Sequence, residues 1–434
     1  MDREKKESGI PWIGEIPANW DVLRYKYVMK KVKEIKEKYL GEDIISLTMN
    51  GVIIRNLLDP KGKMPTSFDG YQKIYKNNLL LCLFDIDVTP RCVGLICNNG
   101  LTSPAYSQFK ILNNSSPEYF NYQLRYIDDL KAFLHLSKNI RSSLTESDFG
   151  SIGTVCPPIK EQQQIASFLD QKSASIDSLI SLQEKMIEEL KAYKQSVITE
   201  AVTKGLDKSV PMKDSGIEWI GEVPEHWEIK RLKNSGYLYS GLSGKSGDDF
   251  DVTDDSEFAY YIPFTNIFNN IIIDLNNLSK VKTHKGESQN SVQCGDLLFL
   301  MSSEDYEGIG KAALLNDHIE NLYLNSFCKG FRITDINLNP KYLNYFFQSF
   351  FIRELIRIEA KGFIRINLRM EKLAIIPILI PTVEEQYLIL DYLDESLRNA
   401  DRLILTKQQK IEQLKEYKKS IIYEYVTGKK QVPN

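Results

Sequence analysis

Long uncharged hydrophobic runs are missing from this sequence. Hydrophobic residues make up 42% and charged residues 26% of the 434 positions, and no window approaches the roughly 18 uncharged apolar residues that a membrane-spanning helix needs. The first residues, Met1 to Glu7, are charged and contain no apolar signal region. The composition is that of a soluble globular protein of two or three domains, which we expect in the cytoplasm without a membrane partner.

Cysteine and histidine are scarce and scattered. The six cysteines show no two-residue spacing, and the four histidines form no pair near them. This pattern argues against a zinc site and against a disulfide framework, so we expect reduced thiols and no bound metal. No serine or cysteine stands with a histidine in an arrangement that supports a nucleophilic triad.

Motifs for nucleotide or methyl-transfer chemistry are incomplete. The segment 244–246 (GKS) looks like the end of a phosphate-binding loop, but the required first glycine is replaced by Tyr239. The segment 338–341 (LNPK) lacks the second proline and the aromatic residue with which adenine methylases hold a flipped base. We therefore predict no catalytic residues and interpret the chain as a binding protein.

A large excess of charge of either sign is also missing. With 55 Lys and Arg against 58 Asp and Glu, the formal net charge is −3. This balance excludes a chain coated in basic surface, although it leaves room for local basic faces. Any affinity for nucleic acid must come from local patches or from a partner subunit.

What the sequence does contain is an internal duplication. All four tryptophans lie in a motif written twice, at residues 8–20 and 215–227, and nine of its thirteen positions are identical. A second pair of matching segments follows at residues 157–203 and 381–427, whereas the interiors at about 21–139 and 228–362 share little identity. Each half thus has constant ends around a variable middle, and two copies imply two sites.

The second pair of matching segments predicts two long helices. Residues 161–203 contain no glycine or proline, and apolar residues recur there at three- and four-residue steps, which is typical of a helix with one apolar face. Pro158 and Pro381 precede the helices, and Gly205 and Gly428 end them. A helix of about 40 residues is about 60 Å long, more than a compact domain usually needs.

Such helices fit three arrangements: an antiparallel coiled coil joining two domains, a parallel pair within a homodimer, or two core helices of two globular domains. We favour the antiparallel pair because of the helix length and the sustained apolar face. The predicted fold class is α+β, with two domains joined by two long helices in an antiparallel coiled coil and a pseudo-twofold internal repeat. The predicted segments are residues 1–155, 156–205, 206–380 and 381–434.

With these features the sequence resembles the specificity subunit of Type I restriction–modification systems, over nearly its whole length. The most specific elements are the doubled tryptophan motif, the Glu-Gln helix starts at 161–162 and 385–386, and the Tyr-Lys-x-Ser helix ends at Tyr193 and Tyr417. In the second middle segment, residues 295–299, 308–310 and 340–343 look like that family's target-recognition domain. The first middle segment departs from this pattern, with Asn77-Asn78 in place of Gly-Asp and residues 117–120 as a remnant of the later motif.

The resemblance implies that each target-recognition domain reads one half of a split, non-palindromic site in double-stranded DNA. It implies that segments 1–155 and 206–380 carry these domains, and that the spacer helices at 156–205 and 381–434 set their separation and bind two methyltransferase subunits. The family also implies adenine-N6 methylation with S-adenosylmethionine in those partners, and cleavage by restriction/translocase subunits that use ATP and Mg²⁺. The chain itself would be a non-catalytic, cofactor-free protein of the prokaryotic cytoplasm.

Reading bases needs hydrogen-bond donors at base edges, with other basic side chains on phosphates. Candidate DNA-binding residues of the two halves, each with a merely solvated side chain as the alternative, are Lys61, Lys63, Arg91, Lys138, Asn139 and Arg141, and Lys245, Lys282, Lys285, Lys361, Arg365 and Arg369. Arg141 and Arg365 share one place of the repeat, in Ile-Arg-x-x-Leu. A residue common to both halves cannot explain different targets, so we favour phosphate positioning or structure for these two.

The tryptophans could stack on bases, but their place in the constant ends favours packing against the helices or a methylase. The residues that we assign to helix packing or a partner interface are Trp12, Trp20, Trp219, Trp227, Leu190, Tyr193, Leu414 and Tyr417.

Two other functions stay open. A non-catalytic repeat scaffold without DNA specificity would show no salt-dependent binding of the assembled complex to duplex DNA. An enzyme with an unrecognised nuclease or methylase site would show turnover by the purified chain alone.

Overall fold

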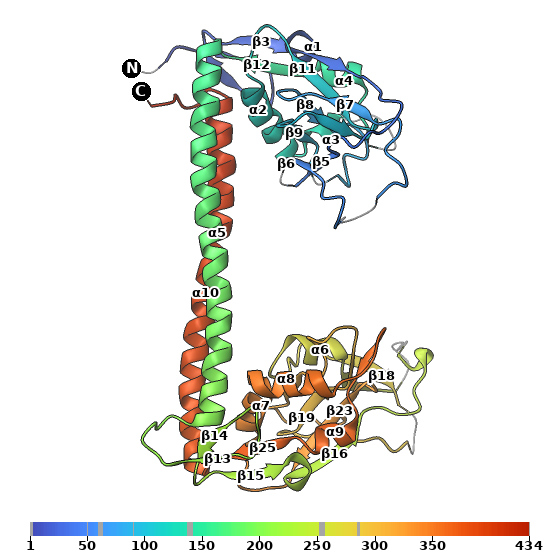
Figure 1. Cartoon of the computed structure of the whole chain (residues 1–434), viewed down its shortest axis with the longest axis vertical. Coiled ribbons are helices and arrows are strands. Elements are labelled where there is room, and N and C mark those ends of the chain that lie inside the picture. The colour runs from blue at the N-terminus through green and yellow to red at the C-terminus, as the bar shows by residue number, and fades with distance from the viewer. Residues whose placement is uncertain are drawn as a thin grey trace. The chain divides into compact units, whose positions relative to one another are not determined.

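The structure is a computed structural model, and it describes residues 3–49, 51–59, 64–89, 91–136, 142–250, 257–283 and 287–433 (Figure 1). The chain forms two compact units: unit 1 comprises residues 1–184 and 408–434, and unit 2 comprises residues 185–407. Each unit holds one α+β domain and part of both long helices.

The domain of unit 1 is built on an antiparallel four-stranded sheet of order β4-β11-β8-β9. Four two-stranded pairs accompany it, namely β1·β2, β3·β12, β5·β6 and β7·β10. The strands are β1 (Lys5–Glu7), β2 (Glu15–Pro17), β3 (Asp21–Arg24), β4 (Met29–Val32), β5 (Ile45–Thr48), β6 (Gly51–Ile54), β7 (Gln72–Ile74), β8 (Leu79–Leu81), β9 (Val93–Leu95), β10 (Gly100–Thr102), β11 (Ser107–Ile111) and β12 (Gly153–Cys156). The short helices are α1 (Tyr25–Val28), α2 (Pro117–Asp129), α3 (Ala132–Leu136) and α4 (Glu146–Ser151).

The domain of unit 2 has a four-stranded sheet of order β16-β23-β19-β21, also antiparallel. A three-stranded sheet β18-β17-β22 and the pairs β13·β14, β15·β25 and β20·β24 accompany it. The strands are β13 (Met212–Asp214), β14 (Glu222–Pro224), β15 (Glu228–Arg231), β16 (Gly236–Ser240), β17 (Phe258–Ile262), β18 (Ser279–Lys282), β19 (Leu297–Leu300), β20 (Ser302–Ser303), β21 (Ala312–Leu314), β22 (Leu322–Leu324), β23 (Cys328–Ile333), β24 (Ile366–Asn367) and β25 (Pro377–Ile380). The helices are α6 (Phe264–Asn269), α7 (Pro340–Gln348), α8 (Phe350–Glu359) and α9 (Met370–Ala374), with 3₁₀ turns η1 (Leu232–Asn234) and η2 (Gly247–Asp249).

The two domains share the order and register of their main sheets, although their middle sequences share little identity. Leu79 of β8 pairs with Phe109 of β11, and Leu297 of β19 pairs with Phe331 of β23. All four side chains are buried in the core of their own unit. The internal repeat therefore extends through the variable middles.

The long helices are α5 (Ile159–Lys204) and α10 (Val383–Val426). In unit 1, the Phe168 ring lies 4.5 Å from the Tyr425 ring, and Lys418 pairs with Asp177 at 2.6 Å. Residues with higher numbers in α5 thus contact residues with lower numbers in α10, so the two helices run antiparallel in this unit. In unit 2 the same direction holds, because Lys194 pairs with Asp401 at 2.5 Å and Lys407 Nζ lies 3.3 Å from Met186 Sδ.

These contacts confirm the predicted α+β class with two long antiparallel helices. The core of unit 1 includes residues from the first part of α5 and the last part of α10. The core of unit 2 includes residues from the last part of α5 and the first part of α10. Among the described residues, no helix is both long enough and apolar enough to cross a membrane.

Candidate nucleic-acid interface

Each long helix ends against the second tryptophan of one motif copy. Gly205 and Gly428 follow α5 and α10 and both have a φ of +72°. A Cβ at Gly205 would lie 3.2 Å from Trp227 Cζ2, and one at Gly428 would lie 2.4 Å from Pro17 Cδ and 3.0 Å from Trp20 Cη2. Only glycine combines this conformation with this close approach.

The four tryptophans lie within or against the cores. Trp20 and Trp227 are 0% and 1% exposed, and Trp12 and Trp219 are half-buried against the same cores. In these positions Trp20 and Trp227 offer no free ring face on which a base could stack.

A lysine fastens each motif copy to a helix end. Lys429 donates to the carbonyl of Glu15 at 2.6 Å, and Lys204 donates to the carbonyls of Glu222 and, at 3.4 Å, Ile220. The first motif copy therefore packs at the end of α10, although hundreds of residues separate the two in the sequence.

The glutamine of each Glu-Gln helix start holds the first turn of a domain helix. Gln162 accepts from the backbone N–H of Ser116 at 2.9 Å and donates to Pro157 O at 2.8 Å. Gln386 accepts from the N–H of Asn339 at 2.8 Å and donates to Asn337 O at 2.7 Å and Pro381 O at 3.0 Å. Ser116 and Asn339 are the N-caps of α2 and α7, so each glutamine ties a domain helix to a long helix.

Two tyrosines of each domain helix extend this attachment. Tyr119 donates to Val426 O at 3.0 Å, and Tyr342 donates to Leu379 O at 3.1 Å and Val202 O at 3.4 Å. One turn later, Tyr122 bonds Asp170 at 2.7 Å and Tyr345 bonds Asp394 at 3.0 Å. Burial raises the pKa of all four tyrosines, so their hydroxyls stay protonated donors. We call each set of one glutamine, two tyrosines and one aspartate a clamp.

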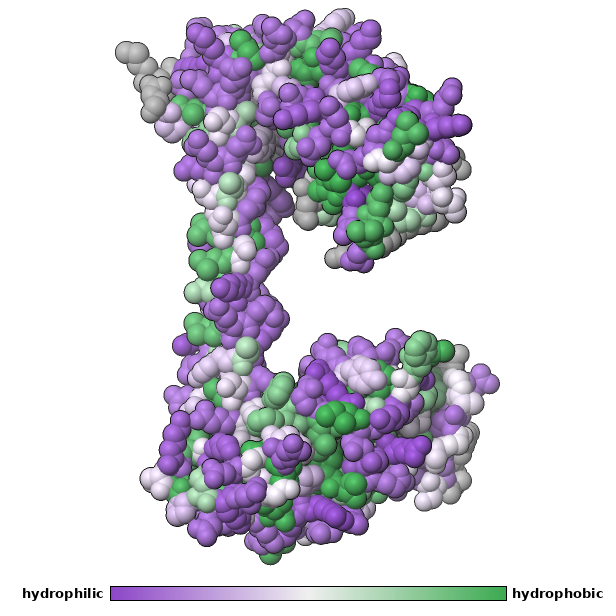
Figure 2. Space-filling view, in the orientation of Figure 1, coloured by the Kyte–Doolittle hydropathy of each residue, from purple (hydrophilic) through white to green (hydrophobic). Residues whose placement is uncertain are grey.

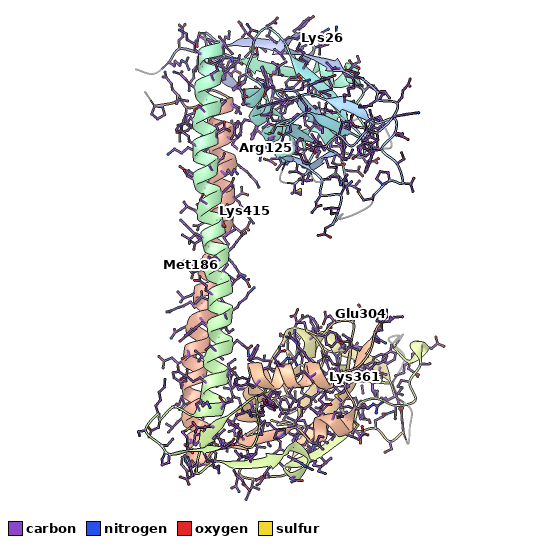
Figure 3. The ribbon with its side chains drawn as sticks, in the orientation of Figure 1. Lys26, Arg125, Met186, Glu304, Lys361 and Lys415 are labelled. Carbon is purple, nitrogen blue, oxygen red and sulfur yellow. The ribbon has the colours of Figure 1, made fainter. Side chains whose placement is uncertain are left out.

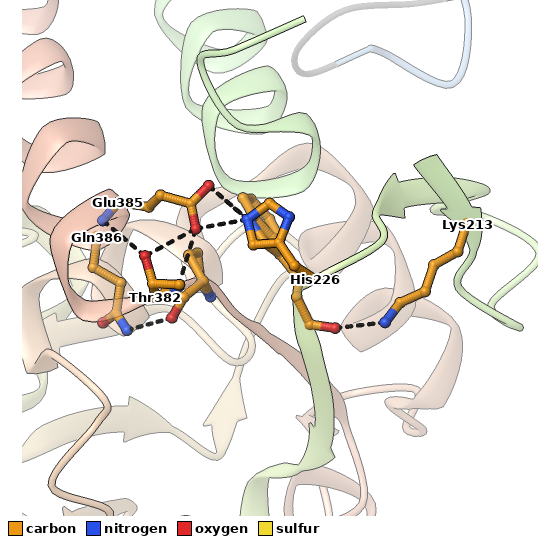
Figure 4. A network of polar contacts seen from close by, with 7 residues as sticks. Lys213, His226, Thr382, Glu385 and Gln386 are labelled. Carbon is orange, nitrogen blue, oxygen red and sulfur yellow. Dashed lines mark hydrogen bonds and ion pairs between the residues drawn. The ribbon is translucent and has the colours of Figure 1, made fainter. Parts of the chain in front are cut away.

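The glutamate beside each clamp glutamine has different partners in the two units. Glu161 forms a bidentate pair with Arg3 at 2.5 and 2.8 Å. Glu385 meets His226 at 2.9 Å, Trp227 Nε1 at 3.4 Å and the N–H of Thr382 at 3.1 Å (Figure 4). Burial alone would raise the pKa of Glu385, but these hydrogen bonds outweigh burial and leave the pKa below its ordinary value.

Six of the twelve candidate DNA-binding residues lie outside the described residues, namely Lys61, Lys63, Lys138, Asn139, Arg141 and Lys285. Arg91 is described and pairs with Asp129 at 2.9 Å and, more distantly, Asp128, with its side chain 13% exposed. Burial raises the pKa of Asp128, and the N–H of Cys92 and the positive charge of Arg91 oppose this rise. This environment favours a structural role for Arg91.

Lys245 and Lys282 hold a loop of unit 2. The Lys245 side chain is 3% exposed and donates to Glu287 at 2.6 Å and to Lys282 O at 2.8 Å. Lys282 donates to Asp248 O at 2.9 Å. These bonds connect the loop after β16 to β18, so both ammonium groups have partners within the domain.

Lys361 (Figure 3), Arg365 and Arg369 are exposed and lie in one segment, whose first part we call the 361–367 hairpin. Lys361 and Asn367 exchange two backbone hydrogen bonds of 3.0 and 2.9 Å. The hairpin is joined to β20 through Ser302↔Asn367 and Ser303↔Ile366. These three candidates lie within nine residues of one another in the sequence, and the structure exposes all three.

The tip of this hairpin carries two residues that the sequence interpretation missed. The side chain of Phe363 is 100% exposed and that of Ile364 is 87% exposed. The available signal was the repeat itself: immediately before the shared Ile-Arg-x-x-Leu, Phe363 stands where the first half has Asn139.

A pocket of about 510 Å³ lies beside the hairpin. Arg365 reaches its rim, where the guanidinium lies 4.9 Å from the centre of the Phe327 ring. The remaining lining residues are Phe264, Thr265 and Phe268 of α6, Ser302, Ser303, Glu304 and Asp305 of β20 and the turn after it, and Asn325 after β22. Exposed Glu304 (Figure 3) and the polar lining can supply hydrogen bonds to base edges.

The helix residues assigned to packing or a partner divide into two kinds. Leu414 is buried and Leu190 half-buried, whereas Tyr193 and Tyr417 are 50% and 56% exposed. Apolar patches continue on the outer surface of the long helices (Figure 2). Further exposed apolar residues of α5 and α10 are Leu179, Leu182, Tyr387, Leu388, Leu403 and Leu405.

Comparison with known proteins agrees with this architecture. Residues 224–415 match the family "Type I restriction modification DNA specificity domain". The chain is 27% identical to the putative type I restriction enzyme MjaX specificity subunit of Methanocaldococcus jannaschii, over 97% of this chain and 96% of the relative. It is 25% identical to the MjaVIII specificity subunit of the same organism, over 96% and 95%. Residues 224–415 thus belong to the type I DNA specificity domain family, and the whole chain is similar to type I specificity subunits.

Solved structures show the same fold. A chain from a study of complex assembly and conformational transition of the type I R-M system superposes with a TM-score of 0.70 and 15% identity, covering 95% of this chain and 98% of that one. The HsdS subunit from Thermoanaerobacter tengcongensis gives a TM-score of 0.54 and 15% identity, with the same coverage. The similarity to specificity subunits thus rests on sequence, and the solved structures show the fold.

Proposed function

We propose that this chain is the sequence-specific DNA-binding subunit of a type I restriction–modification system. It recognises a bipartite, non-palindromic target and directs adenine-N6 methyltransferase and restriction subunits to that target. The observation that carries this proposal is the repeated frame: two domains share one sheet and one clamp but present different side chains on their variable loops. A split site of two unlike halves needs two unlike readers of this kind.

The proposal extends to the partners. Two methyltransferase subunits bind this chain, supply S-adenosylmethionine and perform the chemistry, and the restriction subunits supply ATP-dependent translocation and cleavage with Mg²⁺. The chain itself is non-catalytic. Exposed Tyr193 and Tyr417, at equivalent places of α5 and α10, provide apolar area for such partners.

Methylome sequencing tests the function directly. A host free of adenine methylation expresses this chain with its methylase partner, and a parallel culture expresses the methylase alone. We expect N6-methyladenine in a split motif on both strands only when the chain is present. No new motif, with both proteins soluble and associated, would favour a scaffold without DNA specificity.

Binding to duplex DNA provides a second test. Phosphate contacts release counterions, so the affinity of the assembled complex should fall steeply as the salt concentration rises. Methyl transfer by the purified chain without a partner would instead indicate a catalytic site in this chain.

A further inference from the structure

The tip of the 361–367 hairpin is closed by backbone hydrogen bonds, and Phe363 and Ile364 at this tip are exposed among the residues that the structure describes. Its two backbone bonds close a short loop directly after α8, whose cap residue Ala360 is buried. Gly362 has a φ of +154°, and a Cβ there would lie 2.0 Å from the carbonyl oxygen of Arg365. The chain therefore accepts only glycine at this turn, and the turn places Phe363 in solvent.

A fully exposed phenylalanine contributes nothing to the core of its own domain. Aromatic side chains stabilise proteins by burial of their large apolar area, and Phe363 buries none. Ile364 beside it is nearly as exposed. An apolar pair held at a constrained tip indicates a binding partner rather than a folding role.

The charges around the tip select the kind of partner. Residues 360–369 contain Lys361, Arg365 and Arg369 and no acidic residue. A polyanion is the complementary partner for this segment, and duplex DNA also offers stacked base pairs between which an apolar side chain can insert.

The repeat places this tip among the features that differ between the halves. The first half reads Ser137-Lys138-Asn139-Ile140-Arg141 where the second reads Lys361-Gly362-Phe363-Ile364-Arg365. The isoleucine and arginine are shared, while the residue before them is asparagine in the first half and phenylalanine in the second. A residue that varies beside shared neighbours in the sequence is what discrimination between two half-sites requires.

We propose that Phe363 is an apolar wedge that inserts between base pairs of the half-site bound by unit 2, with Ile364 beside it and Lys361 and Arg365 on the flanking phosphates. Insertion unstacks one base step and bends the duplex, so the half-site is selected partly by how easily that step opens. This inference rests on the proposed DNA-binding function.

The test uses the complex of the full chain with its methylase and a duplex carrying the methylated motif of the wild-type complex. Each adenine of the half-sites is replaced in turn by 2-aminopurine, whose fluorescence rises when it unstacks. The methylase flips its target adenine out of the stack, so a rise at that position is expected for every variant. The wild-type complex should in addition raise the signal at one other step of the half-site bound by unit 2. Phe363→Ala should remove this second rise and weaken binding about tenfold, whereas Phe363→Leu should retain most of both.

Two matched variants separate the wedge from other effects. Ile336 is a control because it is also an apolar residue, 95% exposed, but it follows the end of β23, whereas Phe327, which contacts Arg365 of the hairpin, precedes the start of that strand. Ile336→Ala should change neither the DNA affinity nor the 2-aminopurine fluorescence. Lys361→Ala should reduce the salt dependence of binding while the 2-aminopurine signal persists.

The outcomes distinguish the wedge from the function on which it depends. If the wild-type complex binds and methylates its motif but Phe363→Ala leaves affinity and fluorescence unchanged, the wedge is refuted and the DNA-binding function stands. If the wild-type complex produces no methylated motif and no salt-dependent DNA binding, the proposed function itself fails.

Discussion

The two units differ at the turn before the equivalent strands β8 and β19. Unit 1 has Asn77-Asn78 there, and unit 2 has Gly295-Asp296. Asn77 and Gly295 both adopt positive φ, at 66° and 90°, and asparagine is one of the few side chains that tolerates this region. The departure from Gly-Asp in the first half therefore preserves the turn. Two unlike sequences meet the same backbone requirement.

The residue after that turn shows a second solution to one problem. Asn78 donates to Gln108 at 2.9 Å, whereas Asp296 accepts from Tyr239 at 2.6 Å and from Arg332 at 2.7 and 3.0 Å. In the matched sheets Gln108 corresponds to Gly330, and the Tyr239 ring occupies the space over that glycine.

Unit 1 thus satisfies a buried polar position with a neutral amide pair, and unit 2 does so with an ion pair and a phenol. The comparison teaches that the frame is kept by compensating exchanges, so sequence identity can vanish from the middles while the sheet remains.

The largest expected effect is at the shared helix ends. Trp227→Ala and Trp20→Ala each remove a fully buried indole, and each should lower the free energy of unfolding of its own unit by about 3–5 kcal/mol. Hydrogen exchange followed by mass spectrometry checks that the loss is confined to that unit. The methylated motif should be unchanged in any assembled complex, and a shifted motif would show that these tryptophans read DNA.

The next effect separates the two polar solutions. Asn78→Asp places a carboxylate beside Gln108 with no cation in the contact, and it should destabilise unit 1 by about 3 kcal/mol at neutral pH. Asp296→Asn leaves the part-exposed Arg332 able to reach water and should cost less. Urea unfolding monitored by hydrogen exchange in each unit measures both losses of stability. Equal losses for Asn78→Asp and Asp296→Asn would contradict the predicted difference between the two polar pairs.

The clamps should respond alike in the two units. Gln162→Leu leaves one backbone N–H and one backbone carbonyl without their partner, and Gln386→Leu leaves one backbone N–H and two backbone carbonyls, so each should cost about 2 kcal/mol. Faster exchange at the first turn of α2 or α7 is the expected readout. A large loss of stability in one unit with none in the other would contradict the equivalence of the two clamps.

The smallest effect is the acid sensitivity of the Glu385 contacts. Its pKa lies below the ordinary 4.5, so its stabilising contribution is fully present above 4.5 and is lost as the pH falls through the lowered value. Exchange at the start of α10 should therefore accelerate in that acidic window. Glu385→Gln should abolish this pH dependence, and a transition centred near neutral pH would exclude Glu385 as its source.

The sequence predicted the fold where the repeat and the helical periodicity are strong. Two uninterrupted apolar stripes between Pro158 and Gly205 and between Pro381 and Gly428 suffice for α5 and α10. The common sheet could not be predicted from the first middle segment, because exchanges such as Gln108 with Gly330 are visible only when the neighbouring strand is known.

The candidate interface was predicted less completely. Charge alone selected Arg91 and Lys245, whose partners Asp129 and Glu287 are distant in sequence and hold them within their domains. The same search passed over Phe363, because an apolar residue is ordinarily assigned to a core and only the structure shows its exposure.

Independent reading by the two variable middles is the central claim, and one methylome experiment tests it most directly. Residues 228–380 of this chain, which include the 361–367 hairpin and both paired strands β15 and β25, are replaced by the matching segment of a relative, and the chimera is expressed with the same methylase in a host free of adenine methylation. The account predicts a motif in which one half changes while the other half and the spacer length persist. A motif changed in both halves, or changed in spacer length, would contradict it.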